Sequence, residues 1–154
     1  MTVYYLDASA IAKRYLREQG SAWIETLIEQ VDAHRFVSAA VVSVEVLAAI
    51  ARAVRARRVG PRQAQQAIAR FSVDAQVYWR TWAITDDVLQ RASLLTLRHP
   101  LRAYDAVHLA AALIWADDLA DAGAPAPVLV SADIDLLAAA QAEGMQTDNP
   151  NDHP

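Results

Sequence analysis

Four acidic residues of this chain interrupt otherwise apolar segments, and their types and positions could support metal chemistry. Asp7 and Asp133 each follow a short apolar run, Glu45 lies within a long one, and Asp105 begins another. An ionised carboxylate is costly to bury unless an arginine or a cation compensates its charge. The four acids are therefore the first candidates for a functional site.

A carboxylate cluster favours a particular kind of ion. The chain has no cysteine and 4 histidines, and carboxylate oxygens suit Mg²⁺ or Mn²⁺ better than zinc. Such an ion activates water and neutralises charge that develops on a phosphate, so the expected reaction is hydrolysis of a phosphate ester. Asp7 and Asp105 are the best candidate metal ligands. Glu45 and Asp133 could bind the ion directly, bind it through water, or orient the nucleophile.

Each acid also has a structural alternative. Asp7, Asp105 and Asp133 stand where helix N-termini are expected and could simply cap them, and Glu45 could belong to a structural salt bridge. His108, three residues after Asp105, is interpreted as a packing residue rather than a ligand, because a single histidine on an apolar helix usually has that role.

The elements that would position the acids follow from hydrophobic periodicity and from Gly and Pro breaks. Strands are expected at residues 3–6, 35–38, 77–84 and 128–131. Helices are expected at residues 8–17, 21–30, 41–57, 62–71, 103–119 and 134–142, with another starting at residue 85. This alternation predicts an α/β fold with a mostly parallel central sheet flanked by helices. Ligands of such sheets bind at the carboxyl ends of the strands, where Asp7 and Asp133 fall.

Composition limits the class of protein. With 154 residues, of which 55% are hydrophobic and 21% are charged, we expect one domain over residues 1–148 and a frayed tail at residues 149–154. The absence of cysteine fits a reducing compartment, so a cytoplasmic location is expected. No apolar run approaches the roughly 20 residues of a membrane span.

The net charge of −4 conceals a basic interval between Glu45 and Asp74 that contains no acid. This arginine stripe comprises Arg52, Arg55, Arg57, Arg58, Arg62 and Arg70. It could contact phosphates or an acidic partner, or it could be a solvated helix face.

The candidate acids stand in four motifs, in this order: Asp7-Ala8-Ser9-Ala10 with Lys13, Ser43-Val44-Glu45, Tyr104-Asp105-Ala106-Val107-His108-Leu109-Ala110 and Ser131-Ala132-Asp133. In order and approximate spacing these motifs resemble the PIN-domain nucleases, and the single-domain size is similar to that of the VapC-type toxins of toxin–antitoxin pairs. Together they cover nearly the whole chain.

The resemblance implies a three-layer PIN-like fold and an endoribonuclease that depends on Mg²⁺ or Mn²⁺. It also implies inhibition by a cognate antitoxin and a homodimeric assembly. Arg52, Arg55, Arg57, Arg58 and Arg62 would then lie near the RNA or the antitoxin.

The resemblance assigns roles to the motif residues as well. Asp7, Glu45 and Asp105 would be the core acids, and Asp133 would be a more variable fourth, with Asp135 as the alternative. Ser9 and Ser131 would support the site through their hydroxyl groups.

Two other functions remain open from the sequence. One is a PIN-like binding module that captures a basic partner segment without cleaving anything. The other is a metal-dependent phosphoesterase acting on DNA or on a small phosphoester.

Overall fold

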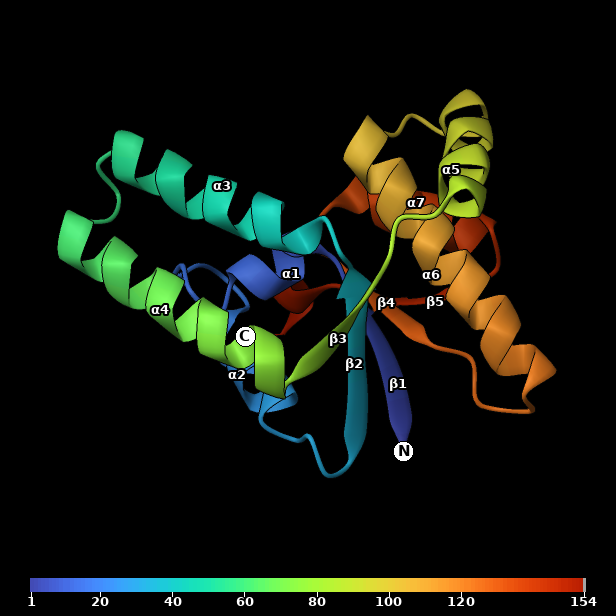
Figure 1. The fold of residues 1–154 in the computed structure, drawn as a ribbon, viewed down its shortest axis with the longest axis horizontal. Helices are drawn as coiled ribbons and strands as arrows, with labels where there is room; N and C mark the ends of the chain where they lie inside the picture. The colour runs from blue at the N-terminus through green and yellow to red at the C-terminus, as the bar shows by residue number, and fades with distance from the viewer. Residues whose placement is uncertain (154) are drawn as a thin grey trace.

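The computed structural model describes residues 1–153 and contains a five-stranded sheet in which every strand pair is parallel (Figure 1). The strands are β1 (Thr2–Leu6), β2 (His34–Ala39), β3 (Trp79–Trp82), β4 (Val128–Val130) and β5 (Gln146–Asp148). Their order across the sheet is β3-β2-β1-β4-β5, so β1 is central. The predicted α/β fold with a parallel sheet is confirmed.

Helices cover both faces of this sheet. They are α1 (Ala8–Ala12), α2 (Ser21–Ile28), α3 (Val42–Arg55), α4 (Pro61–Val77), α5 (Asp86–Arg98), α6 (Ala103–Asp121) and α7 (Ile134–Ala142). Figure 1 shows α1 to α4 on one face and α5 to α7 on the other, which gives the expected three layers. Within residues 1–153, no helix combines the length and the apolar character needed to cross a membrane.

Strand β1 is apolar at nearly every position because each of its faces contacts a separate core. Val3 and Tyr5 pack in the core beneath α5, α6 and α7. Tyr4 and Leu6 point the other way, into the core beneath α1 to α4. Asp7 follows directly, so the buried strand delivers this carboxylate to the carboxyl edge of the sheet.

Helix α4 is longer than the sequence predicts. The expected helix at residues 62–71 begins at Pro61 and continues to Val77, into the start of the expected strand. Phe71 and Asp74 explain the continuation, because these residues lie three apart on one helix face and both are buried. Tertiary contacts of that face outweigh the local preference for a strand.

The chain end is also more ordered than expected. The frayed tail predicted for residues 149–154 is wrong for residues 149–153, which include the short 3₁₀ helix η1 (Pro150–Asp152); residue 154 lies outside the described residues. Pro150 is buried, and the ring of His153 stacks on Trp23 at 4.1 Å between centroids. The segment is ordered because it packs on the region around α2, a contact that its polar sequence does not reveal.

Candidate active site

Asp7 lies at the floor of the site, at the junction of β1 and α1. Its carboxylate caps α1 by accepting the backbone N–H of Ala10 at 2.9 Å. It also accepts the hydroxyl of Ser9 at 2.8 and 3.0 Å, and the hydroxyl of Ser131 at 2.8 Å. Asp7 is 4% exposed, so these hydrogen-bond donors replace the water molecules that burial removes from its carboxylate.

The two serines connect the ends of β1 and β4. Ser9 Oγ accepts the backbone N–H of Ala132 at 2.8 Å, and Ser131 Oγ accepts that of Asp133 at 3.0 Å. Asp133 caps α7 through its own carboxylate and lines the same cavity as Asp7. Asp135 is exposed and does not line the cavity, so of the two residues Asp133 is the one that lies with the other acids.

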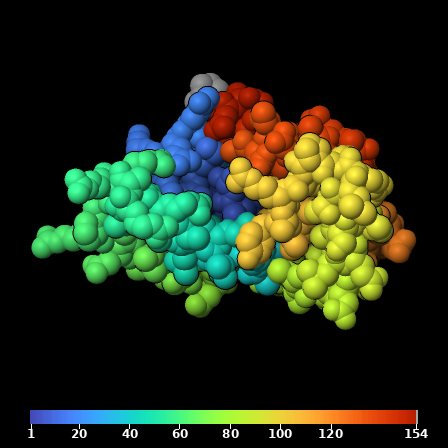
Figure 2. Space-filling view, turned by 90° about the horizontal axis from the view of Figure 1, so that it is seen from above, coloured from blue at the N-terminus to red at the C-terminus, as the bar shows by residue number. Residues whose placement is uncertain are grey.

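Glu45 and Asp105 approach the site from opposite sides. Each lies in the first turn of its helix, α3 for Glu45 and α6 for Asp105. A cavity of about 490 Å³ is lined by these two acids together with Asp7 and Asp133. Figure 2 shows the hollow between α3, in teal, and the start of α6, with the N-terminal segment in dark blue at its floor. The fold thus brings together all four acids that the sequence singled out.

Glu45 lies within an apolar run of the sequence, but it is not fully buried in the structure. Its neighbours Val44 and Leu47 are 63% and 40% exposed, and the Glu45 side chain itself is 19% exposed. This part of α3 therefore lies at the rim of the cavity and is not covered by other elements. This opening gives the carboxylate access to the cavity.

Burial and mutual repulsion perturb the acids. Burial raises the pKa of Asp7 above its ordinary value, although nearby His108 and the hydrogen bonds to the carboxylate oppose the shift. Burial also raises the pKa of Asp105, and the negative charges of Asp133 and Asp7 raise it further. A cation would relieve both effects, because it stabilises the ionised form of every acid it contacts.

The carboxylate oxygens that line the cavity suit a hard divalent ion, but they are not positioned to bind one without movement. Within residues 1–153, no three Asp, Glu or His side chains are close enough to form a preassembled metal site. Both oxygens of Asp7 accept serine hydroxyls, Oδ1 from Ser9 and Oδ2 from Ser131. Oxygen donors and raised pKa values fit Mg²⁺ or Mn²⁺, so binding would require adjustment of the side chains.

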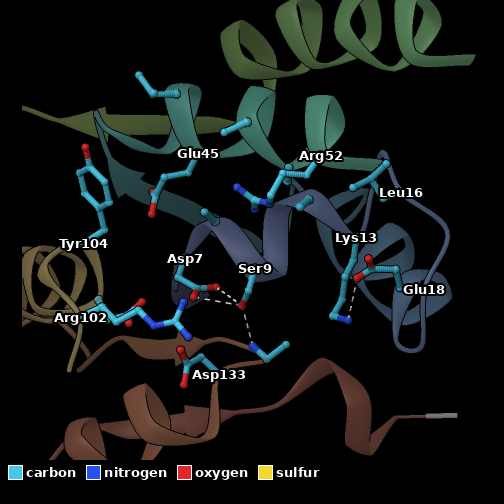
Figure 3. A pocket seen from close by; sticks show the side chains of 17 residues that line it. Asp7, Ser9, Lys13, Leu16, Glu18, Glu45, Arg52, Arg102, Tyr104 and Asp133 are labelled. Carbon is cyan, nitrogen blue, oxygen red and sulfur yellow. Dashed lines mark hydrogen bonds and ion pairs between the residues drawn. The ribbon is translucent and has the colours of Figure 1, made fainter. Parts of the chain in front are cut away.

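Cationic side chains also line the cavity. They are Lys13, Arg52 and Arg102, and Figure 3 shows Arg102 extending toward the space between Asp7 and Asp133. In the part of the chain that the structure describes, neither arginine forms an ion pair with an acid. The sequence analysis did not single out Arg102, whose only signal was its position three residues before Asp105.

The members of the arginine stripe lie in different surroundings, and Arg70 pairs with Glu25 at 2.7 Å. Arg52 lines the cavity, whereas Arg58 pairs with Glu18 at 3.0 Å. The remaining members of the set expected to bind RNA or antitoxin are exposed but do not line this cavity: Arg55, Arg57 and Arg62.

His108 was interpreted as a packing residue, and the structure shows that this description is incomplete. The residue is 1% exposed, yet its Nε2 lies 2.6 Å from Glu45 Oε2 and its Nδ1 lies 3.0 Å from the hydroxyl oxygen of Tyr5. The spacing Asp105-x-x-His108 was the available signal, because residues i and i+3 share a helix face.

Comparison with known proteins agrees with this fold. The model of the PIN domain family matches residues 4–142, and the chain belongs to that family. Two curated relatives in Mycobacterium tuberculosis, named Ribonuclease VapC45 and Ribonuclease VapC49, are each 35% identical over 120 residues, covering 76% of this chain and 79% of theirs. These matches confirm the resemblance to VapC-type proteins that the motifs indicated.

Solved structures share the fold at lower identity. VapBC2 from Rickettsia felis, solved bound to a DNA fragment from its promoter, gives a TM-score of 0.62 at 10% identity, with 96% of this chain and 98% of that chain covered. PAE2754 from Pyrobaculum aerophilum gives 0.60 at 19% identity, covering 95% and 83%. FitAcB from Neisseria gonorrhoeae gives 0.60 at 14% identity, covering 97% and 98%.

Proposed function

We propose that this chain is a metal-dependent endoribonuclease and the toxin member of a toxin–antitoxin pair. The observation that carries the proposal is the convergence of Asp7, Glu45, Asp105 and Asp133 on one cavity from four separate segments. The two relatives that are 35% identical bear the name Ribonuclease VapC. Caps and salt bridges alone would not require four acids to meet.

The residues divide the work by position. Asp7 and Asp105 would hold the Mg²⁺ or Mn²⁺, and Glu45 and Asp133 would complete its surroundings directly or through water. When bound, such an ion would activate a water molecule and neutralise charge on the phosphate. Ser9 and Ser131 keep the Asp7 carboxylate fixed between β1 and β4.

The basic side chains suit an RNA substrate. Lys13, Arg52 and Arg102 line the same cavity as the acids and would bind phosphates on either side of the scissile bond. The more distant arginines of the stripe, Arg55, Arg57, Arg58 and Arg62, would contact RNA or antitoxin outside the cavity.

The cavity rim suits a cognate antitoxin. Val44 and Tyr104 are 63% and 56% exposed beside the acids, so a partner segment that carries apolar residues and one basic residue would match both the surface and its charge. We also propose a homodimer, which light scattering of the purified protein would test.

Cleavage of a cellular RNA pool tests the function. The antitoxin-free protein is incubated with Mg²⁺, Mn²⁺ or excess chelator, alongside Asp105→Asn, which should abolish metal-dependent cleavage, and the matched control Asp135→Asn, which should not. DNA and a small phosphoester are assayed in parallel. Cleavage of DNA or the phosphoester instead of RNA would reject the substrate, and metal-independent cleavage by both variants would reject the site.

A further inference from the structure

Three side chains form a hydrogen-bonded chain from the centre of the sheet to the cavity. Tyr5 Oη lies 3.0 Å from His108 Nδ1, and His108 Nε2 lies 2.6 Å from Glu45 Oε2. The three residues come from β1, α6 and α3. Tyr5 and His108 are 0% and 1% exposed, and the proposed reaction so far gives neither of them a role.

The direction of these hydrogen bonds follows from the partners. An ionised Glu45 carboxylate can only accept, so His108 Nε2 carries a proton and donates it. Burial, followed by the negative charge of Asp7, raises the pKa of Tyr5 well above its ordinary value, so its hydroxyl keeps its proton and can donate it to His108 Nδ1. With that proton on Nε2, the lone pair of Nδ1 can accept the Tyr5 hydroxyl, so one arrangement of hydrogens satisfies both contacts.

His108 is not placed to bind a metal ion or RNA itself. Both ring nitrogens have partners, and the residue does not line the cavity. Glu45 does line the cavity, and within residues 1–153 its Oε1 has no hydrogen bond. The imidazole therefore engages one carboxylate oxygen and leaves the other one available.

We propose that Tyr5 and His108 are positioning residues that fix the orientation of the Glu45 carboxylate toward the cavity. The effect on cleavage rests on the proposed function, since a fixed Oε1 would bind the metal ion or accept a hydrogen bond from its water. A glutamate has three rotatable side-chain bonds, and holding it in one orientation before the ligand arrives lowers the entropic cost of binding. Buried partners of metal-ligating side chains commonly contribute about 10–100-fold to metal affinity or activity.

The first test needs no cleavage. In ¹⁵N NMR of the intact metal-free protein, with the signal assigned by its loss in His108→Gln, His108 Nε2 should carry a proton and Nδ1 should accept a hydrogen bond. Tyr5→Phe should shift the Nδ1 signal toward that of an unbonded ring nitrogen and leave the Nε2 proton in place. A proton on Nδ1 in the wild-type protein, or no shift in Tyr5→Phe, would overturn the proposal.

The second test separates positioning from packing. His108→Met removes the donor to Glu45, whereas His108→Gln retains an N–H group. We expect His108→Met to weaken Mn²⁺ binding and to lower kcat by about 10–100-fold with little change in KM for RNA, and His108→Gln to restore part of both. In a Glu45→Gln background, His108→Met should have no further effect on Mn²⁺ affinity.

His99→Met is the matched control, because His99 also contacts a glutamate, Glu143, at 2.7 Å but does not line the cavity. It should leave Mn²⁺ affinity and kcat unchanged. Equal effects of His108→Met with and without Glu45→Gln would overturn the positioning role while leaving the nuclease intact. If the protein cleaves no RNA, the NMR and Mn²⁺ measurements still decide the inference. If His108→Met does not fold, Tyr5→Phe is measured in its place.

Discussion

At the scale of single residues, the ionised acids of the cavity lower the free energy of unfolding. Burial, then the charges of Asp133 and Asp7, raise the pKa of Asp105, so the folded chain holds that proton more tightly than the unfolded chain. The resulting stabilisation is complete below the unfolded pKa and is lost as pH rises through the folded pKa. At neutral pH without metal, the ionised acid therefore opposes folding.

Asp105→Asn should consequently stabilise the metal-free protein at pH 7, by about 1 kcal/mol or less, because solvent screens the charge of this half-buried group. Urea denaturation in the presence of chelator measures this change, and the gain should shrink as the pH is lowered toward 4. The exposed Asp135→Asn is the control and should change little. A destabilised Asp105→Asn at pH 7 would contradict this account of the site.

The sequence supplied the four acids but not the partners of Glu45. Acids that interrupt apolar runs are visible in any sequence, and Asp7 and Asp133 could be placed at strand ends. The contact between His108 and Glu45 joins α6 to α3 across 63 positions, and no local pattern specifies such a pair. For the same reason the cavity-lining position of Arg102 emerged only from the fold.

At the scale of elements, the hairpin of α3 and α4 is held to the body by a buried ion pair. Arg14 Nε donates to Asp74 on α4 at 2.8 Å, and their side chains are 3% and 8% exposed. The hydroxyl of Tyr15 donates to the same carboxylate at 2.9 Å. Two further ion pairs reach the hairpin, Arg58 with Glu18 and Arg70 with Glu25, and their arginines are 57% and 43% exposed.

Asp74→Ala should therefore destabilise the protein by about 3–5 kcal/mol, because it removes the buried partner of the Arg14 charge. Among the described residues, only Glu29, an exposed acid 3.9 Å from Arg14 Nη1, then remains close to that charge. Arg58→Ala removes an exposed pair and should cost about 1 kcal/mol or less. Equilibrium denaturation of both variants compares the two directly. Similar losses in the two variants would show that the buried pair does not anchor the hairpin.

Elements with strong periodicity could be predicted, whereas those specified by tertiary contacts could not. The apolar runs of β1 and β4 identified two central strands. Strand β5 has the polar sequence Gln146-Thr147-Asp148 and is a strand because β4 pairs with it. The extension of α4 depends on Asp74, whose partner Arg14 lies 60 positions away.

At the scale of the whole molecule, the C-terminal segment clasps the region before α2. Gly20 has φ of +80°, and a Cβ atom there would lie 2.4 Å from the carbonyl oxygen of Pro150. Gly123 has φ of +68° with nothing within 4 Å of its Cβ position. The two glycines therefore share a left-handed backbone but differ in the close approach.

Gly20→Ala should cost more stability than Gly123→Ala, which carries only the backbone penalty of about 1–2 kcal/mol for a left-handed conformation. Gly20→Ala should also separate His153 from Trp23 and so change the tryptophan fluorescence before global unfolding. Thermal denaturation followed by fluorescence and by circular dichroism reads both effects. Equal losses in stability for the two variants would show that the close contact between Gly20 and Pro150 does not contribute to stability.

Because some arginines line the cavity and others lie far from it, their contributions to RNA binding should differ. Arg52 lines the cavity, whereas Arg62 lies at the far end of the hairpin, in the first turn of α4. Arg52→Ala should weaken RNA binding and reduce the slope of log K against log salt concentration by about 0.7, the value for one single-strand phosphate contact. Arg62→Ala should change the slope less. Filter binding in chelator measures both, and a larger effect of Arg62→Ala would move the RNA path onto the hairpin tip.

The hydrogen bond between Ser131 and Asp7 joins positions 124 residues apart. During synthesis, Asp7 therefore leaves the ribosome long before the strand that completes its surroundings has been translated. Strand β1 can pair early with β2, but the edge that carries Ser131 and Asp133 arrives only with the last part of the chain. A nascent or truncated chain that lacks β4 would thus have no complete cleavage centre, and the proposed nuclease could form only after β4, Ser131 and Asp133 have been translated.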